Sequence, residues 1–196
     1  MRGLLVLLVV LGACGKGDAS PPPGKGEAPV VAAGWEGKND PEDLKALLTA
    51  IREDATKDPA KAAALTRGLL VDKDSVEVAV ADPALAQKLV EQVAMVPKDD
   101  AQVAGMLDPK KPEYSDITAH GATTEEILAN AEGGVARAEF PGGVRKLAEK
   151  GLLQKGVTFY EVEWTPKGES AGMKYHLFFW DGQRWRMLGP AWRGVE

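Results

Sequence analysis

The chain has 196 residues, of which 44% are hydrophobic and 27% charged, and its formal net charge is −5. This composition is typical of a globular protein with one ordinary domain, and it excludes a largely disordered chain. The acidic balance, without a run of basic residues, argues against nucleic-acid binding, which requires concentrated Lys and Arg. The single cysteine, Cys14, cannot form an internal disulfide, so the folded part must be stable from its apolar core alone.

The first 14 residues have the layout of an export signal. Arg2 precedes an uninterrupted apolar run at residues 4–11, which is too short to span a bilayer because spanning needs ~20 residues. The run leads into Leu11-Gly12-Ala13-Cys14, which resembles the bacterial lipobox. The resemblance implies cleavage of residues 1–13, a diacylglycerol on the Cys14 thiol and an N-terminal acyl chain such as palmitate. An ordinary signal peptide cut after Ala13 is the alternative.

The residues after the lipobox bear on location and on domain boundaries. Gly15 is not the Asp that resembles an inner-membrane retention signal in many Gram-negative bacteria. This favours the outer membrane, facing the periplasm or the surface, if the host is Gram-negative. Residues 14–38 are rich in Gly, Pro and Ala, which predicts a flexible tether before a single globular domain at residues 39–196. We interpret Trp35, within the tether, as docking on the first helix of the domain.

Asp-Pro pairs predict the first helices. An Asp accepts a hydrogen bond at the helix start and Pro tolerates the first helical position, so three of these pairs predict helices at about 41–55, 59–70 and 83–96. Residues 76–80 alternate as a strand does, but the nearby Asp74 favours a short helix. Residues 97–112 predict a short helix and a loop.

The middle of the chain predicts a strand followed by two helices. Residues 114–120 indicate the strand. Thr123 and Glu126 fit a capping box that opens a helix ending at about residue 131. A second helix is predicted at residues 143–150, with Gly151 after its end.

The C-terminal segments 158–165, 173–180 and 183–188 are aromatic and branched, and they indicate an antiparallel meander. Strand alternation predicts a core face with Tyr160, Val162, Trp164, Tyr175, Leu177, Phe179, Trp185 and Met187. It predicts a solvent face with Glu161, Glu163, Lys174, His176, Arg184 and Arg186, on which Glu163 lies beside Lys174 and Glu161 beside His176. A three-residue turn at 180–182, with Gly182 left-handed, would pair Leu177 with Trp185 and Tyr175 with Met187.

These elements predict an α+β domain, in which N-terminal helices pack on the core face of a C-terminal antiparallel meander of three to four strands. Their order resembles the cone-shaped nuclear-transport-factor-like superfamily, in which helices precede a curved antiparallel sheet. The resemblance covers at most the last two thirds of the chain. It implies a pocket between helices and sheet without implying a ligand.

The sequence has no familiar catalytic, phosphate-binding or metal-binding motif, so we predict no catalytic residue and no cofactor. A weaker hypothesis is an acid/base or metal site made of His176, Glu161, His120 and Asp116. A solvated ladder of charges on the outer face of the sheet would explain the same residues.

A candidate binding patch is suggested by aromatic residues beside arginines. Phe178 falls on the predicted solvent face and Trp180 on a turn, next to Arg184 and Arg186. Such a composition is common in protein-contact sites. Alternatively, Arg184 lies over Phe178 in a cation–π contact.

The sequence therefore predicts an envelope lipoprotein, held on a bilayer by acylated Cys14. Its domain would act as a non-catalytic module that binds an envelope protein or polymer. The alternatives are a pocketed enzyme or small-ligand carrier that uses His176 and Glu161, and a purely structural protein.

Overall fold

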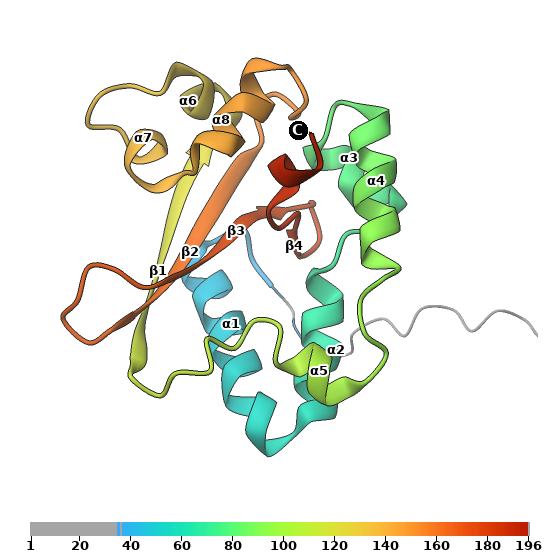
Figure 1. Ribbon diagram of the computed structural model, residues 1–196, viewed down its shortest axis with the longest axis vertical. Helices are drawn as coiled ribbons and strands as arrows, with labels where there is room; N and C mark the ends of the chain where they lie inside the picture. Colours follow the sequence, from blue (N-terminus) through green and yellow to red (C-terminus); the bar gives the residue numbers. More distant parts are fainter. Residues whose placement is uncertain (1–34, 36, 196) are drawn as a thin grey trace, which may run out of the picture. The chain divides into compact units, whose positions relative to one another are not determined.

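The computed structural model describes residue 35 and residues 37–195. The predicted signal peptide, the lipobox with Cys14 and most of the tether lie outside the described residues. Along the described chain (Figure 1) the elements are α1 (Pro41–Lys57), α2 (Pro59–Leu69), α3 (Lys73–Ala79), α4 (Pro83–Val93), α5 (Asp100–Ala104), β1 (Tyr114–Thr123), α6 (Thr124–Ala129), α7 (Val135–Glu139), α8 (Gly142–Glu149), β2 (Thr158–Pro166), β3 (Met173–Trp180), β4 (Trp185–Met187) and the 3-10 helix η1 (Ala191–Gly194).

The N-terminal helices begin where the Asp-Pro pairs predict. The side chains of Asp40, Asp58 and Asp82 each accept a hydrogen bond from a backbone N–H in the first turn, and proline follows each of them. The ambiguous segment at 76–80 is helical up to its last residue, but its cap is Asp72 and not Asp74. All of the predicted N-terminal helices are therefore confirmed.

The second half is a four-stranded antiparallel sheet in the order β1-β2-β3-β4, with α6, α7 and α8 between the first two strands. The fold class is thus α+β, as predicted. The capping box of Thr123 and Glu126 is present, and Gly151 has φ +67° after α8. The short elements α7 and η1 were not predicted, because five and four residues give too little periodicity to read.

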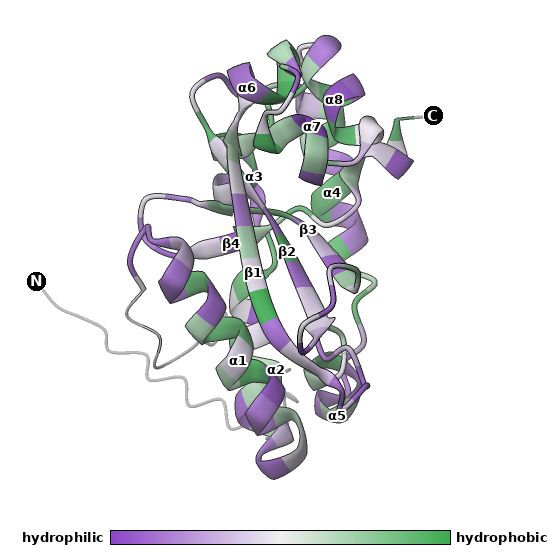
Figure 2. Cartoon of the chain, turned by 90° about the vertical axis from the view of Figure 1, so that its left-hand side faces the viewer, coloured by the Kyte–Doolittle hydropathy of each residue, from purple (hydrophilic) through white to green (hydrophobic). Residues whose placement is uncertain are grey.

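Each face of the sheet packs a core of its own, which corrects the prediction that one face meets solvent. We call the side chains packed between the sheet and α1 and α2 the first core, and Figure 2 shows the hydrophobic side of α1 turned toward the sheet. The first core includes Leu44, Leu48, Ile51, Leu69, Val162, Trp164, Phe178 and Trp185. The second core joins the other face to α3, α4, α6 and α8, and includes Val76, Leu89, Ile127, Val144, Leu147, Phe159, Leu177 and Phe179.

A β-bulge interrupts β3. In the register of β2 and β3, Tyr160 pairs with Phe178 and Val162 pairs with Tyr175, so residues 176–177 both lie opposite the one residue between Tyr160 and Val162. The second of these two residues has φ +57°, a left-handed conformation that is uncommon for leucine. One extra residue reverses the alternation of every side chain that follows it.

The bulge explains which predicted faces were wrong. Tyr175 and Phe178 both face the first core, whereas Leu177 and Phe179 face the second. Tyr175, Leu177 and Phe179 therefore do not share a face. Phe178 is fully buried, so its predicted exposure is wrong.

The hairpin between β3 and β4 also differs from the predicted one. Trp180 pairs with Trp185, whereas the three-residue turn required Leu177 opposite Trp185. The predicted pairing of Tyr175 with Met187 is wrong for the same reason. The turn glycine does have the predicted positive φ, at +100°.

Candidate functional site

Six titratable side chains gather on the second-core face of the sheet, and we call them the His/Glu cluster. They come from β1, β2, β3 and the last residue of α7, and they are His120, Glu139, Glu161, Glu163, Lys174 and His176. Alternation along β2 places Glu161 and Glu163 on one face. The strand register then sets His120 beside Glu161 and Lys174 beside Glu163.

Glu161 and His176 form the buried half of the cluster. Nδ1 of His176 lies 2.5 Å from Oε2 of Glu161, and the carboxylate has no exposed surface. The ring of Trp192 packs edge-on against His176, with 4.9 Å between the ring centroids. The predicted pairing of Glu161 with His176 is confirmed, but as a buried contact and not as an exposed one.

The environment of Glu161 is costly for a charged group. Burial raises the pKa of Glu161, and the contact with His176 and a hydrogen bond from the backbone N–H of Leu177 offset this rise only in part. Its Oε1 atom is buried and has no hydrogen-bond partner among the described residues. A buried carboxyl group that lacks a partner costs free energy of folding, and such groups concentrate at functional sites.

Lys174 holds the other half together. Its Nζ lies 2.7 Å from Oε2 of Glu139 and 3.6 Å from Oε2 of Glu163, while Nε2 of His120 lies 3.8 Å from Oε2 of Glu139. The hydrogen bond from Lys174 lowers the pKa of Glu139. Burial alone would lower the pKa of Lys174, but its hydrogen bonds to Glu139 and Glu163 and the charges of these two carboxylates together outweigh burial and raise the pKa. One atom each from His120, Glu139 and Glu163 lie within 4.8 Å of one another, close enough to share a metal ion.

The structure brings together three of the four residues of the acid/base or metal hypothesis. His176, Glu161 and His120 belong to the cluster. Asp116 does not, because it is exposed near the far end of β1, beside Thr165. The alternative, a solvated charge ladder, is wrong in that Glu161 is buried beneath the sheet's helical cover.

Sequence reasoning missed Glu139, and named Glu163 and Lys174 only as a cross-strand pair. That pair is confirmed by the register. Strand alternation alone would have placed both residues next to Glu161. No sequence signal located Glu139, because it ends a five-residue helix that the sequence did not predict.

The predicted aromatic and arginine patch does not form on the surface. Phe178 is fully buried, so Arg184 has no ring to cover there. Trp180 packs edge-on against Trp185 at 5.6 Å between centroids. Arg186 is buried and pairs with carboxylates instead, at 2.7 Å from Asp181 in the nearer case.

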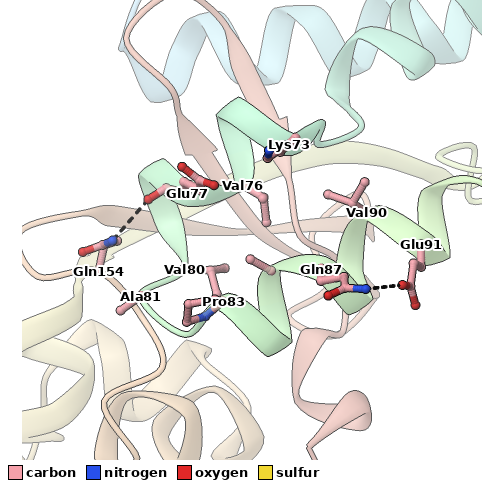
Figure 3. Close-up of a pocket in the computed structure, with 11 residues that line it drawn as sticks. Lys73, Val76, Glu77, Val80, Ala81, Pro83, Gln87, Val90, Glu91 and Gln154 are labelled. Carbon is pink, nitrogen blue, oxygen red and sulfur yellow. Dashed lines mark hydrogen bonds between the residues drawn. The ribbon is translucent and has the colours of Figure 1, made fainter.

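A separate groove of about 730 Å³ lies between α3 and α4 (Figure 3). The apolar lining of the groove includes Val76, Val80 and Ala86. Figure 3 shows polar side chains such as Glu77 and Gln87 at its rim. The three apolar residues are only 1%, 3% and 6% exposed. Ala81, Pro83 and Val90 also line the groove and are exposed or half-buried, so the groove does offer apolar surface to a ligand.

No protein-family model, no curated protein and no solved structure matches this chain. The resemblances to lipobox lipoproteins and to the nuclear-transport-factor-like superfamily therefore stay predictions. Among residues 35 and 37–195, no helix combines the length and the apolar character needed to cross a membrane.

Proposed function

We propose that this protein is an envelope lipoprotein, anchored through lipid on Cys14, whose domain binds a small cationic ligand at the His/Glu cluster without catalysis. The anchor rests on the lipobox, in which the chain's single cysteine occupies the position that lipidation requires. Several acyl chains hold a protein on a membrane durably, since each buried methylene adds ~0.8 kcal/mol. The favoured location is the outer membrane, facing the periplasm or the surface.

One observation supports the ligand site: Glu161 is a fully buried carboxyl group with an unpartnered oxygen, at the centre of other titratable groups. A structural network would satisfy its buried members, because an unsatisfied buried acceptor costs about 1–3 kcal/mol. A ligand that supplies the missing donor explains why the carboxyl group is tolerated.

The charge of the cluster favours a cation. The carboxyl groups of Glu139 and Glu163 share the ammonium group of Lys174, and the third, that of Glu161, contacts the imidazole of His176, so the cluster holds three carboxyl groups and one ammonium group. Sites with an excess of one charge attract ligands of the opposite charge. The partially exposed Lys174 and His120 leave the cluster open to solvent at one side, through which a small ion can enter.

Binding fits the six side chains better than catalysis does, because none of them is a hydroxyl or thiol nucleophile. One contact favours the enzyme alternative. Glu161 orients the ring of His176, as the carboxylate partner of a catalytic histidine does, so the pair could transfer a proton to or from a bound ligand.

The anchor is tested by fractionation and mass spectrometry of the full chain expressed in a Gram-negative host. We expect the protein in the membrane fraction, with an N-terminal peptide that begins at an acylated Cys14. The Cys14→Ser variant should be soluble or remain unprocessed. An unmodified thiol at Cys14 in the mature protein would overturn the anchor and the location.

The ligand site is tested by thermal unfolding of the detergent-purified full chain. We expect one member of a cation panel (Zn²⁺, Mg²⁺, Ca²⁺, choline and spermidine) to raise the unfolding temperature, since binding to the native state stabilises it. The rise should be lost in Glu161→Gln and Glu163→Gln. It should persist in Glu149→Gln, the same change at a half-exposed pair outside the cluster. A panel without effect on the wild type would overturn the site.

A further inference from the structure

We infer that the cation is a divalent transition-metal ion such as Zn²⁺, bound by His120, Glu139 and Glu163. This inference rests on the proposed function, namely that the cluster binds a cation. The three residues come from β1, from the end of α7 and from β2, and the tertiary structure brings one ligand atom of each within 4.8 Å of the others.

The separations between the three ligand atoms are close to those of a metal site. Zn²⁺ in a tetrahedral site has bonds of about 2.0–2.1 Å, which set neighbouring ligand atoms about 3.3 Å apart. Nε2 of His120 already lies 3.8 Å from Oε2 of Glu139. Closing the remaining distances requires only small rotations of three side chains, none of which is fully buried.

The donor types favour a transition metal over calcium or magnesium. Zn²⁺ binds imidazole nitrogen and carboxylate oxygen alike, and three protein ligands leave a position for water. Ca²⁺ and Mg²⁺ prefer oxygen ligands alone. The His120 imidazole therefore distinguishes between the two classes of ion.

Lys174 would compete with the ion for the same carboxylates. Its ammonium group bridges Glu139 and Glu163, the two carboxylates of the inferred site. The side chain is 28% exposed and has a flexible stem, so it can swing into solvent. A divalent ion carries twice the charge of the ammonium group that it replaces. Lys174 thus keeps the two carboxylates close together and competes with the metal.

Glu161 supplies a second and independent indication of a ligand. It is the cross-strand partner of His120 and lies two residues from Glu163 on the same face of β2. Its Oε1 is buried without a donor. A histidine that binds metal through Nε2 usually donates its Nδ1–H to a carboxylate or to another acceptor, and metal-bound water is a donor too. Metal binding would thus bring a donor for Oε1, the oxygen of this carboxyl group that lacks one.

The test uses Co²⁺ as a spectroscopic probe and Zn²⁺ as its competitor. The full chain is purified in detergent and stripped with a chelator before titration. We expect one Co²⁺ per chain, with visible absorption bands that Zn²⁺ abolishes. Replacing each ligand by Gln (His120, Glu139 or Glu163) should weaken binding by more than the roughly 10–100-fold expected for the outer residue in Glu161→Gln. Lys174→Met should instead tighten binding by about tenfold or more, because a competing positive charge is removed.

Glu149→Gln is the matched control and should bind as the wild type does. Circular dichroism establishes that each variant is folded. If His120→Gln does not fold, the result with Glu139→Gln tests the site in its place, because the Glu139 side chain is a quarter exposed at a helix end and its replacement should leave the fold intact. If Co²⁺ binds equally well to the wild type and to all ligand variants, it binds outside the three inferred ligands, and the inference is then wrong. If choline or spermidine stabilises the chain through Glu161 and no metal binds, the proposed function stands and the metal assignment fails. If no cation binds, both fail.

Discussion

Glu161 faces two residues of β3 at once: the ring of His176, with Nδ1 2.5 Å from its Oε2, and the backbone N–H of the left-handed Leu177. Glu161 lies opposite both residues of the bulge, so its carboxyl group meets the ring of the first, His176, and the backbone N–H of the second, Leu177. An unusual backbone conformation and a buried, partly unsatisfied acid at the same place are typical of a site that is kept for function at a cost in stability.

Glu161→Gln should therefore stabilise the metal-free protein at pH 7, by about 1 kcal/mol. The amide keeps an acceptor for the backbone N–H of Leu177 and avoids burial of a carboxylate. Urea unfolding followed by tryptophan fluorescence measures the change, with Glu149→Gln as the exposed control. A loss of more than about 1 kcal/mol would indicate that the pair with His176 is a net stabilising contact.

Phe178→Ala should cost about 3–5 kcal/mol, because the ring is fully buried in the first core. Strand alternation without the bulge would place this residue in solvent and predict almost no effect. Met173→Ala, in the same strand at 36% exposure, is the matched control and should change stability by less than about 0.5 kcal/mol. Equal effects of the two changes would contradict the bulged register.

Gly143→Ala should destabilise the protein by about 1–3 kcal/mol through overpacking. A methyl group there would lie 2.3 Å from two ring atoms of Trp192, the residue that covers His176. The adjacent Gly142→Ala is the comparison, since its methyl group meets no atom within 4 Å and helix propensity favours Ala by roughly 0.5–1 kcal/mol. The two variants should move the urea midpoint in opposite directions, and a shift in the same direction would refute the packing.

Asp181→Asn should lower stability at pH 7 by about 1–3 kcal/mol, since it removes one of the two carboxylates that pair with the buried Arg186 and leaves Asp72 as the other. Burial alone would raise the pKa of Asp181, but the hydrogen bond from Arg186 and those from two backbone N–H groups outweigh it and lower the pKa. An acid with a lowered pKa stabilises the fold above its unfolded pKa of about 3.9 and loses that contribution as the pH falls through its folded value.

The difference in unfolding free energy between wild type and Asp181→Asn should therefore be constant from pH 7 to 5 and shrink toward pH 3. Urea titrations at these three values measure it. Asp74→Asn, at an exposed position in the first turn of α3, serves as control. A difference that stays the same at pH 3 would mean that the charge of Asp181 does not support Arg186.

Local signals in the sequence were sufficient for most of the elements. Asp caps before Pro, the Thr123–Glu126 capping box and the Gly151 stop fix helix ends through hydrogen bonds within one turn, so they can be read without a partner. The aromatic segments of the meander were equally clear. Trp35 does dock on the first helix, where its indole N–H donates to Asp43, as predicted.

The sequence by itself thus determined the α+β class, the order of the elements and two cross-strand pairs of the cluster, Glu161 with His176 and Glu163 with Lys174. Only the tertiary structure decided the faces of β3, because a bulge is set by packing on both sides of a sheet and not by local propensity. It also decided that Glu139 joins His120 and Glu163, since a short helix acquires its position from its neighbours. A site built from four separate elements depends on long-range contacts. No local pattern in a single sequence records such contacts.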